Sequence, residues 1–277
     1  MRPTLNIVGA GHVGRVLGRL FAQRGVFDVQ DVLTRSQASA RQAVGFIGAG
    51  RALHEARSMR PAAVWMLAVG DDQIAPVCAA LAQAGLLADA VVFHCSGAKS
   101  SAELDAAARL GAATASVHPV RSFADPQAVA AAFDGTFCGI EGAPKALALL
   151  GPAFEAIGAR LVTIDAAAKT VYHAASVFAS NYLVTVLDAA LRAYQAAGIP
   201  PEVARELAVP LAGETLSNLL RLGPEAALSG PVARGDMATV ARQQAAVTAW
   251  DAPTGALYAA LADATVDLAR RKHGRNA

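Results

Sequence analysis

Short apolar runs alternate with amphipathic segments over residues 1–165. The apolar runs are rich in β-branched residues and predict strands at Leu5–Val8, Val29–Leu33, Ala63–Val69, Val91–His94, Thr114–Val117, Thr136–Ile140 and Leu161–Ile164. Segments with a helical period lie between most of them, for example Val13–Arg24, Asp72–Ala84 and Pro144–Ile157. Strands that are apolar on both faces and alternate with helices are typical of a parallel sheet covered on both sides. We therefore predict a doubly wound α/β domain over residues 1–165.

The pattern changes after Asp165, where no further strand is predicted. Residues 166–197 contain neither glycine nor proline, so they can form one helix of about 30 residues and roughly 48 Å. Gly198 and the prolines after it are expected to end this helix. Further helices are predicted at about Glu202–Leu222 with a break at Pro210, at Met237–Trp250 and at Pro253–Lys272. Residues 166–277 are thus expected to form an all-helical domain.

Composition narrows the class of protein. Hydrophobic residues make up 54% and charged residues 17%, which excludes a disordered chain, and a net charge of +2 without a basic run argues against a nucleic-acid partner. The uncharged stretch Gln73–Leu87 is interrupted by Pro76 and Gly85, so we expect no spanning helix, and no signal peptide is recognised either. The three cysteines lack metal-ligand spacing, so we expect reduced thiols, no metal site and a cytoplasmic protein.

A glycine-rich turn directly follows the first predicted strand. Its sequence is Gly9-Ala10-Gly11-His12-Val13-Gly14, and a predicted helix begins there. In a dinucleotide-binding turn the first glycine makes the turn, the second admits the pyrophosphate, and the third allows helix–strand packing. The helix N-terminus offers N–H groups to the phosphates. Gly9, Gly11, His12, Val13 and Gly14 are therefore predicted to bind a dinucleotide, although a turn without a ligand has the same local pattern.

The end of the second predicted strand indicates which dinucleotide binds. An NAD-preferring site has Asp or Glu here for the ribose hydroxyls, whereas this chain has Thr34-Arg35-Ser36. These hydroxyls and the guanidinium suit a 2′-phosphate, and Asp31 lies three residues too early in the strand. NADP is therefore favoured over NAD, with an ordinary surface arginine as the alternative explanation of Arg35.

Polar residues follow other strands at the edge where doubly wound sheets bind ligands. Val69 precedes Gly70-Asp71-Asp72 and is expected to contact the cofactor. Ser96 and Gly97 follow a strongly apolar strand and are expected beside the nicotinamide, unless they form a plain turn. His118 stands before Pro119 at the end of another strand and either faces the substrate or is structural.

A polar stripe begins the predicted long helix. Lys169 and His173 are four residues apart and so share a face, which Ser176 and Ser180 continue, with Asn181 about two turns beyond His173. Such side chains form either a polar site or a hydrogen-bond network between helices. Arg234 lies in the loop Gly230–Asp236 and could bind an anionic substrate group, while Asp236 is a natural helix N-cap.

These residues together resemble a known superfamily, along the whole chain. A Rossmann domain followed by a helical domain that opens with a long helix is similar to the phosphogluconate and hydroxyisobutyrate dehydrogenases. In those two families the long helix carries a catalytic Lys with Asn four residues later; Lys169 matches the Lys, but His173 replaces the Asn. Ketopantoate, pyrroline-carboxylate and deazaflavin-dependent NADP reductases share the plan.

Within that superfamily the chain most resembles a bacterial family of uncharacterised Rossmann proteins with a helical domain of unknown function. The shared motifs are His94-x-Ser96-Gly97, His118-Pro119, Tyr172-His173, Ser180-Asn181-Tyr182 and Gly230-Pro231-x-x-Arg234-Gly235-Asp236. The resemblance implies an NADP-dependent oxidoreductase acting on a small carbonyl, imine or hydroxy-acid-type substrate bound between the two domains.

The expected roles follow from this interpretation. Lys169 or His173 would supply the proton, Asn181 would position the substrate together with His173, Ser96 and His118 would complete the site, and Arg234 would hold an anionic group. The alternatives are a cofactor-binding sensor without turnover and, less favoured, a helical half that serves only oligomerisation. We also expect a homodimer through the helical half, because a helix of roughly 48 Å is too long for so small a domain to cover.

Overall fold

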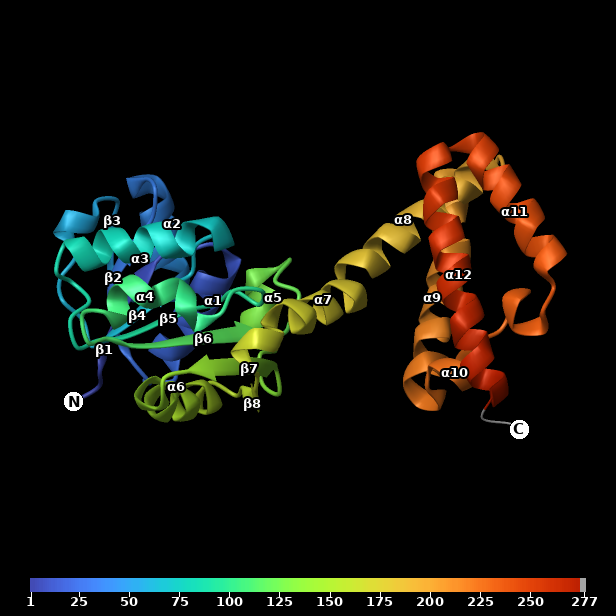
Figure 1. Cartoon of the computed structure of the whole chain (residues 1–277). Helices are drawn as coiled ribbons and strands as arrows, with labels where there is room; N and C mark the ends of the chain where they lie inside the picture. The colour runs from blue at the N-terminus through green and yellow to red at the C-terminus, as the bar shows by residue number, and fades with distance from the viewer. Residues whose placement is uncertain (275–277) are drawn as a thin grey trace. The chain divides into compact units, whose positions relative to one another are not determined.

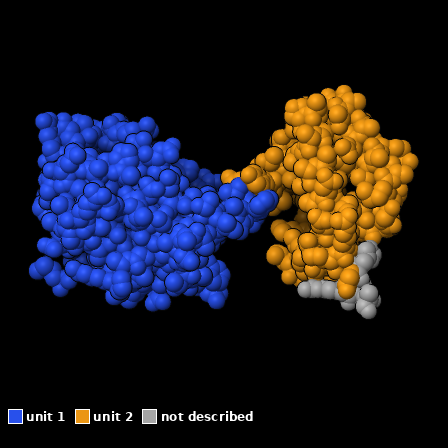
Figure 2. All heavy atoms as spheres, viewed as in Figure 1, with its two compact units in different colours: residues 1–180 blue, residues 181–277 orange. Residues whose placement is uncertain are grey.

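The computed structural model describes residues 1–274 and divides into two compact units, which meet at Ser180 and Asn181. Figure 2 colours these units separately. The division falls after Ser180 rather than near Asp165, because the first helix after the sheet belongs to the same unit as the sheet.

The first unit is built on one sheet of eight strands (Figure 1). In chain order these are β1 (Thr4–Val8), β2 (Asp28–Leu33), β3 (Arg51–Leu53), β4 (Val64–Leu67), β5 (Val91–His94), β6 (Ala113–Pro119), β7 (Phe137–Gly142) and β8 (Arg160–Thr163). Their order across the sheet is β3-β2-β1-β4-β5-β6-β7-β8. Each predicted strand is present within two residues of its predicted ends.

The sheet is parallel except at one pair. Strand β7 runs antiparallel to β6, which corrects the expectation of a wholly parallel sheet. An antiparallel neighbour starts at the edge where the previous strand ends, so the chain between β6 and β7 needs no crossover. Strand β3, which was not predicted, has three residues on the outer edge and is too short to show a period.

Helices cover both faces of the sheet. They are α1 (His12–Gln23), α2 (Gln37–Ile47), α3 (Ile74–Gln83), α4 (Asp105–Ala108), α5 (Pro126–Ala131), α6 (Pro144–Ala156) and, after β8, α7 (Lys169–Ala179). One buried cluster joins α1, α2, α5 and α6 to one face, and a second joins α3 and α4 to the other. The expected doubly wound architecture is therefore confirmed. It places the carboxyl ends of β1, β4, β5 and β6 at one edge.

The second unit is helical throughout its described residues. It contains α8 (Asn181–Ala196), α9 (Pro201–Leu222), α10 (Pro224–Ala227), α11 (Met237–Trp250) and α12 (Ala252–Gly274). Helix α8 packs on α9, and α11 packs on α12. The buried residues among the described part of this unit are few and mostly small, namely Ala204, Ala208, Val240, Thr254, Gly255 and Ala269.

Two helix predictions need correction. The long helix expected over residues 166–197 is interrupted at Ser180, whose φ of −129° and ψ of −74° are not helical, so α7 and α8 are separate helices. The break expected at Pro210 is absent, because α9 continues through it. Pro210 is exposed, where the carbonyl that it leaves unpaired can bond to water.

One helical stretch bears on the expectation that no segment spans a membrane, which stays a prediction. The helical stretch 166–196 is long and apolar enough to cross a membrane, judged by length and composition alone, with a hydropathy of 1.4 over its most apolar window. None of that window is buried. The uncharged stretch Gln73–Leu87, which lies in the first unit, is shorter than this one.

Candidate active site

The glycine turn after β1 is packed too tightly for side chains at two positions. Gly9 has a φ of +81°, and a Cβ there would lie 2.6 Å from the carbonyl oxygen of Ala68 and 2.7 Å from Cγ1 of Val69. A Cβ on Gly14 would lie 2.6 Å from the carbonyl oxygen of Gly9. Both glycines are therefore required by the fold. Val69 lies against the turn, and its expected contact with the cofactor stays a prediction.

Gly11 differs, because a Cβ at this position would meet nothing within 4 Å. Gly11 is the N-cap of α1, and no side chain caps the helix. The first N–H groups of α1 thus lie beside open space, with a positive helix end behind them. This is the arrangement that suits a pyrophosphate. His12 directs its ring to the carbonyl oxygen of Phe123, 2.6 Å from Nδ1, and Val13 is half-buried in the same turn.

The residues after β2 have the exposure that a cofactor contact requires. Arg35 is exposed, and Thr34 donates to the carbonyl oxygen of Ser36 at 2.9 Å. The Ser36 hydroxyl accepts from the Ser39 amide at 3.2 Å and caps α2. These contacts form a compact turn at the end of β2.

The one acidic residue of β2 near this turn is Asp31, and it is engaged elsewhere. Its side chain is fully buried and forms ion pairs with Arg51 at 3.0 Å and Arg60 at 2.7 Å. Burial alone would raise the pKa of Asp31, but hydrogen bonds from Arg60 and Arg51 outweigh it and hold the pKa below its ordinary value. A carboxylate bound in this way is not free for a ribose.

The loop after β5 is held at both ends by a buried histidine. The amide of Ser96 donates to Nδ1 of His94 at 3.2 Å, and Nε2 of His94 donates to the carbonyl oxygen of Ser100 at 3.0 Å. The Ser96 hydroxyl accepts from the amides of Ala98 and Lys99 at 3.2 and 3.0 Å. Ser96 and Gly97 therefore lie in a loop with little freedom at the carboxyl edge of the sheet.

Lys169 is the first residue of α7, and its side chain contacts the loop that follows β5. Its ammonium donates to the carbonyl oxygen of Ser96 at 3.2 Å and to the Ser116 hydroxyl at 2.5 Å, and it lies 3.7 Å from Oε1 of Glu141. Glu141 in turn accepts from the amide and the hydroxyl of Ser101 at 2.7 and 2.8 Å. The Lys169–Glu141 pair thus joins α7 and β7 to both ends of the loop.

The Lys169–Glu141 pair is almost fully buried, and this burial affects the pKa of Lys169. The side chain of Lys169 is 2% exposed and that of Glu141 is 7% exposed. Burial lowers the pKa of Lys169, and the charge of Glu141 offsets part of that effect. In this structure the enclosed ammonium contacts protein groups, and the role of Lys169 as a proton donor to substrate stays a prediction.

Three aromatic side chains lie on the other side of the loop. His118 from β6 and His173 from α7 have ring centroids 5.5 Å apart, and Nδ1 of His118 lies 3.1 Å from the Tyr172 hydroxyl. A Cβ on Gly97 would lie 2.3 Å from Cδ2 of His173 and 2.7 Å from Cε1 of His118. Only glycine at position 97 lets both imidazoles approach the loop.

His118 is a neutral side chain at physiological pH. Burial, together with the nearby charges of His173 and Lys169, lowers its pKa to about 4. A neutral imidazole retains one N–H donor and one acceptor nitrogen. His118 is suited to donate a hydrogen bond to a carbonyl or imine, or to accept one from a hydroxyl.

The structure therefore brings Ser96, His118, Lys169 and His173 close together, while their roles stay predictions. It does not continue the polar stripe to Asn181, because the interruption at Ser180 makes Asn181 the first residue of α8 in the other unit. Arg234 is exposed in that unit too, and Asp236 caps α11 through the Thr239 amide. For Asn181 and Arg234, a role in the site stays a prediction.

Sequence reasoning missed Glu141, Ser116 and the contact made by Tyr172. A carboxylate within the otherwise apolar strand β7 was the available signal for Glu141, since a lone charge in a buried strand requires a partner. Ser116 and Tyr172 carry no such local signal. Their contacts depend on which strand lies beside which.

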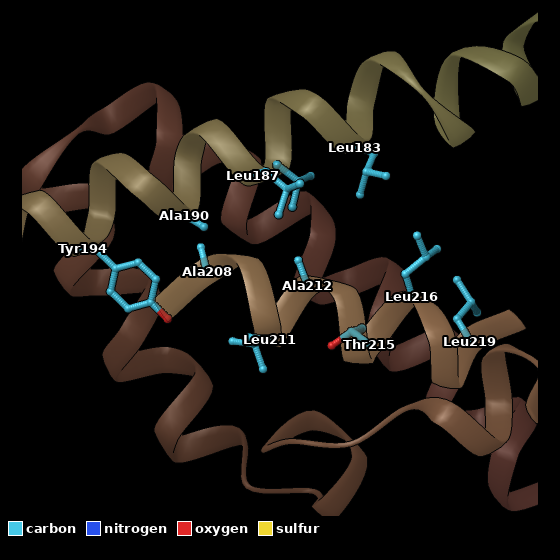
Figure 3. Close-up of a pocket in the computed structure, with 11 residues that line it drawn as sticks. Leu183, Leu187, Ala190, Tyr194, Ala208, Leu211, Ala212, Thr215, Leu216 and Leu219 are labelled. Atoms are coloured by element: carbon cyan, nitrogen blue, oxygen red, sulfur yellow. The ribbon is translucent and has the colours of Figure 1, made fainter. Parts of the chain in front are cut away.

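An apolar groove lies in the second unit between α8 and α9. Its volume is about 290 Å³, and Figure 3 shows side chains of both helices facing each other across it. The lining is almost entirely aliphatic, comprising Leu183, Val186, Leu187, Ala190, Tyr194, Ala208, Leu211, Ala212, Thr215, Leu216 and Leu219. It offers no charged group for catalysis.

Comparisons with known proteins support the resemblance drawn from the motifs. Residues 1–119 match the model of a Rossmann-like domain, and residues 136–265 match a domain of unknown function, DUF2520. No curated protein matches the chain. The resemblance to Rossmann proteins with a helical domain of unknown function is confirmed.

Solved structures share the fold over nearly the whole chain. Protein TM1727 from Thermotoga maritima is 27% identical with a TM-score of 0.74, covering 97% of this chain and 99% of its own. BF3122 from Bacteroides fragilis, with a proposed NADP oxidoreductase activity, is 19% identical with a TM-score of 0.78, covering 96% and 98%. A reductive aminase from Aspergillus terreus in complex with NADPH is 16% identical with a TM-score of 0.64, covering 99% and 95%.

Proposed function

Because the chain joins a Rossmann-like domain to a DUF2520 domain, we propose that it is an NADP-dependent oxidoreductase acting on a small carbonyl, imine or hydroxy-acid-type substrate. One observation carries the proposal. The uncapped start of α1 beside open space and the His118–Tyr172–His173 cluster lie at the same carboxyl edge of one sheet. A nucleotide and a reacting group placed there would lie in one compact unit. The NADPH complex of the reductive aminase, which has a similar fold, supports the same choice of cofactor.

The residues present fit a dinucleotide. The first N–H groups of α1 and the Gly9–Gly14 turn would hold the pyrophosphate, and Thr34, Arg35 and Ser36 would face the adenosine end. When bound, the nicotinamide supplies the redox chemistry by giving or accepting a hydride. The protein must bind, orient and move protons.

The preference for NADP rests on charge at the end of β2. Arg35 is exposed and can pair with a 2′-phosphate, whereas the carboxylate of Asp31 is buried and paired with two arginines. No acidic side chain of the turn at 34–36 would repel that phosphate.

Among the chain's own residues, we assign the substrate contacts to the two histidines. Neutral His118 donates a hydrogen bond that polarises the substrate, and His173, half-buried beside it, transfers the proton. Lys169 acts as a positioning residue, because its ammonium holds the Ser96 carbonyl and the Ser116 hydroxyl instead of a substrate.

The proposal is tested by measuring NADPH binding to the purified protein with isothermal titration calorimetry. Gly11→Ala places a methyl group in open space and should leave the fold intact, yet it would obstruct a pyrophosphate and weaken NADPH binding by at least tenfold. Gly45→Ala in α2 is the matched control, because its methyl group also meets nothing within 4 Å. Absence of NADPH binding to the wild type, or equal affinities of the two variants, contradicts the proposal.

Turnover separates an enzyme from a sensor. NADPH oxidation is then measured with aldehydes, ketones and imines, and NADP reduction with hydroxy acids. NADPH binding without turnover of any of these compounds would favour a cofactor-binding sensor.

We further propose that the second unit forms a homodimer through the groove between α8 and α9. Large apolar side chains there are exposed, for example Leu211 at 58% and Leu216 at 45%, which is unusual in a monomer. A second copy presents the same aliphatic face and would bury it. Light scattering in detergent-free buffer should give twice the chain mass of 28.2 kDa.

The oligomer can be tested by substitution in the groove. Leu211→Glu should yield a monomer, while Leu110→Glu, at an exposed leucine of the first unit, should not. A wild-type monomer at micromolar concentration contradicts the homodimer. Recovery of the protein only with detergent or lipid would instead indicate that the apolar stretch 166–196 meets a membrane.

A further inference from the structure

We propose that Tyr172 is a positioning residue that fixes His118 in the tautomer with its proton on Nε2. The inference rests on the proposed function, in which His118 faces the substrate. Its structural content, the position of one proton, can be tested without a cofactor or substrate.

The contact between the two side chains is direct. Nδ1 of His118 lies 3.1 Å from the Tyr172 hydroxyl, and the rings meet edge to face, with centroids 5.7 Å apart and planes at 89°. At this distance either the hydroxyl donates to Nδ1 or Nδ1–H donates to the hydroxyl. The surroundings of the hydroxyl decide between these two arrangements.

The hydroxyl of Tyr172 lies against the backbone of β7. A Cβ on Gly139 would lie 2.5 Å from the hydroxyl oxygen, so only glycine admits the tyrosine here. Gly139 pairs with His118 across β6 and β7, which places all three residues together. Among the described residues, Nδ1 of His118 is the one hydrogen-bond partner of this hydroxyl, and the phenol hydroxyl has a single proton to donate. The hydroxyl proton is then left for Nδ1 of His118.

Tyr172 keeps this proton. Burial raises the pKa of Tyr172, although the nearby backbone of Gly139 offsets part of the effect. The phenol is therefore a donor at neutral pH, and Nδ1 of His118 is its acceptor.

His118 must then carry its own proton on Nε2. The ring is neutral, because burial and the charges of His173 and Lys169 lower its pKa to about 4, while Asp71 acts weakly in the opposite direction. Nε2 lies 2.8 Å from where a Cβ on Gly97 would be, on the side of the loop where His173 also lies. The donor hydrogen thus faces the place where we expect the substrate carbonyl or imine.

Gly97 and Gly139 make room at the two ring nitrogens of His118. Gly139 admits the hydroxyl that binds Nδ1, and Gly97 leaves room at Nε2. The same imidazole without Tyr172 would exchange between two tautomers, and one of them would present a bare nitrogen to the substrate. Tyr172 therefore fixes the polarity of the site.

Nitrogen NMR of the full chain with ¹⁵N-labelled histidine tests the proposal. The six histidines are few enough to resolve, and His118→Gln identifies the signals of His118. In the wild type at pH 7, Nε2 of His118 should show the shift of a protonated ring nitrogen and Nδ1 that of an unprotonated one.

Tyr172→Phe should convert the His118 signals to those of a tautomer mixture, with thermal unfolding that still shows a folded protein. Tyr194→Phe, at a tyrosine of the α8–α9 groove, is the matched control and should leave these signals unchanged. Gly139→Ala keeps the phenol but displaces it, so it should have the effect of Tyr172→Phe.

Two results would overturn the proposal: a proton on Nδ1 in the wild type, or signals of His118 that do not respond to Tyr172→Phe. Failure of the proposed function is a separate outcome, because the tautomer is measured without NADPH. A protein that shows the Nε2 tautomer but binds no nucleotide would retain this inference and refute the enzyme.

Discussion

Replacing Lys169 with Met should destabilise the first unit by about 3–5 kcal/mol, the usual cost of removing one partner from a buried ion pair. Methionine retains most of the apolar stem but removes the ammonium from the Ser96 carbonyl, the Ser116 hydroxyl and Glu141. The carboxylate of Glu141 would remain 7% exposed without its cation and with Ser101 as its remaining partner. The structure therefore assigns the cost mainly to an uncompensated buried charge.

A second substitution tests that assignment. Glu141→Gln alone leaves the ammonium of Lys169 without its anion, so it should also be strongly destabilising. The double variant carries neither charge. Its loss should be smaller than the sum of the two single losses by about 1–3 kcal/mol, as for residues coupled in one network.

Urea unfolding followed by tryptophan fluorescence measures these losses. The chain has two tryptophans; Trp65 is fully buried in β4 of the first unit, and Trp250 lies in the second. All variants are therefore made in a Trp250→Phe background, so that Trp65 alone reports on the unit that contains Lys169.

Lys99→Met is the matched control. Lys99 pairs with Glu103 at 3.1 Å, but its side chain is 40% exposed, so its removal should cost less than about 1 kcal/mol. If Lys169→Met costs no more than Lys99→Met, or if the double variant loses the full sum, the ammonium does not hold the loop. Lys169 would then be available to contact a substrate, as the resemblance to phosphogluconate dehydrogenases implies.

Three further predictions concern the cofactor and the histidines. Arg35→Asp should weaken NADPH binding at least tenfold, about 1.4 kcal/mol, with NADH binding unchanged; equal loss of both nucleotides in calorimetry would contradict the 2′-phosphate contact. The pKa of His118 is about 4 when folded against an ordinary value near 6.5, so the unfolded state binds more protons between these values. The free energy of unfolding should therefore fall by up to about 3 kcal/mol as pH decreases from about 6.5 to about 4, and His118→Gln should flatten that dependence in urea titrations. Gly97→Ala should displace the rings of His118 and His173 by about 1 Å and cost about 1–3 kcal/mol, whereas Gly45→Ala should not destabilise the protein.

The sequence was informative wherever the signal is local. Strands β4 and β5 are apolar and buried on both faces, and the turn Gly9–Gly14 needs glycine for reasons within a few residues, so both were predicted closely. Helices α11 and α12 likewise follow from their start signals and periodicity.

The sequence was uninformative about features that depend on residues far away in the chain. The residues around Ser180 contain no glycine or proline, yet the helix is interrupted there, where the two units meet. Pro210 is a strong helix breaker by propensity, but α9 accommodates it at an exposed position. Strand β3 exists because β2 offers it an edge, and three residues carry too little pattern to show this.

The site shows the same limit more sharply. Lys169, His173, Ser96 and His118 were recognisable as polar residues at a strand edge and on one helix face. Their partners were not, because Glu141 and Gly139 lie on the antiparallel strand β7, whose place beside β6 no local pattern specifies. The roles of the recognised residues therefore depend on neighbours that sequence reasoning could not see.

The division of roles between Lys169 and His173 follows from the position of α7. The helix begins at Lys169, directly after a short turn that Asp165 caps through the Ala167 amide. Side chains on a helix lean toward its N-terminus, so the side chain at the first position is directed back toward the sheet, where Ser96, Ser116 and Glu141 enclose it. His173 lies on the same face one turn later, about 5.4 Å further along the axis. Lys169 is therefore a buried cation that hydrogen-bonds the loop after β5. One turn later, His173 packs against Gly97 beside His118. A lysine at the start of this helix is therefore not sufficient evidence of a catalytic lysine, because its depth decides whether it binds protein or substrate.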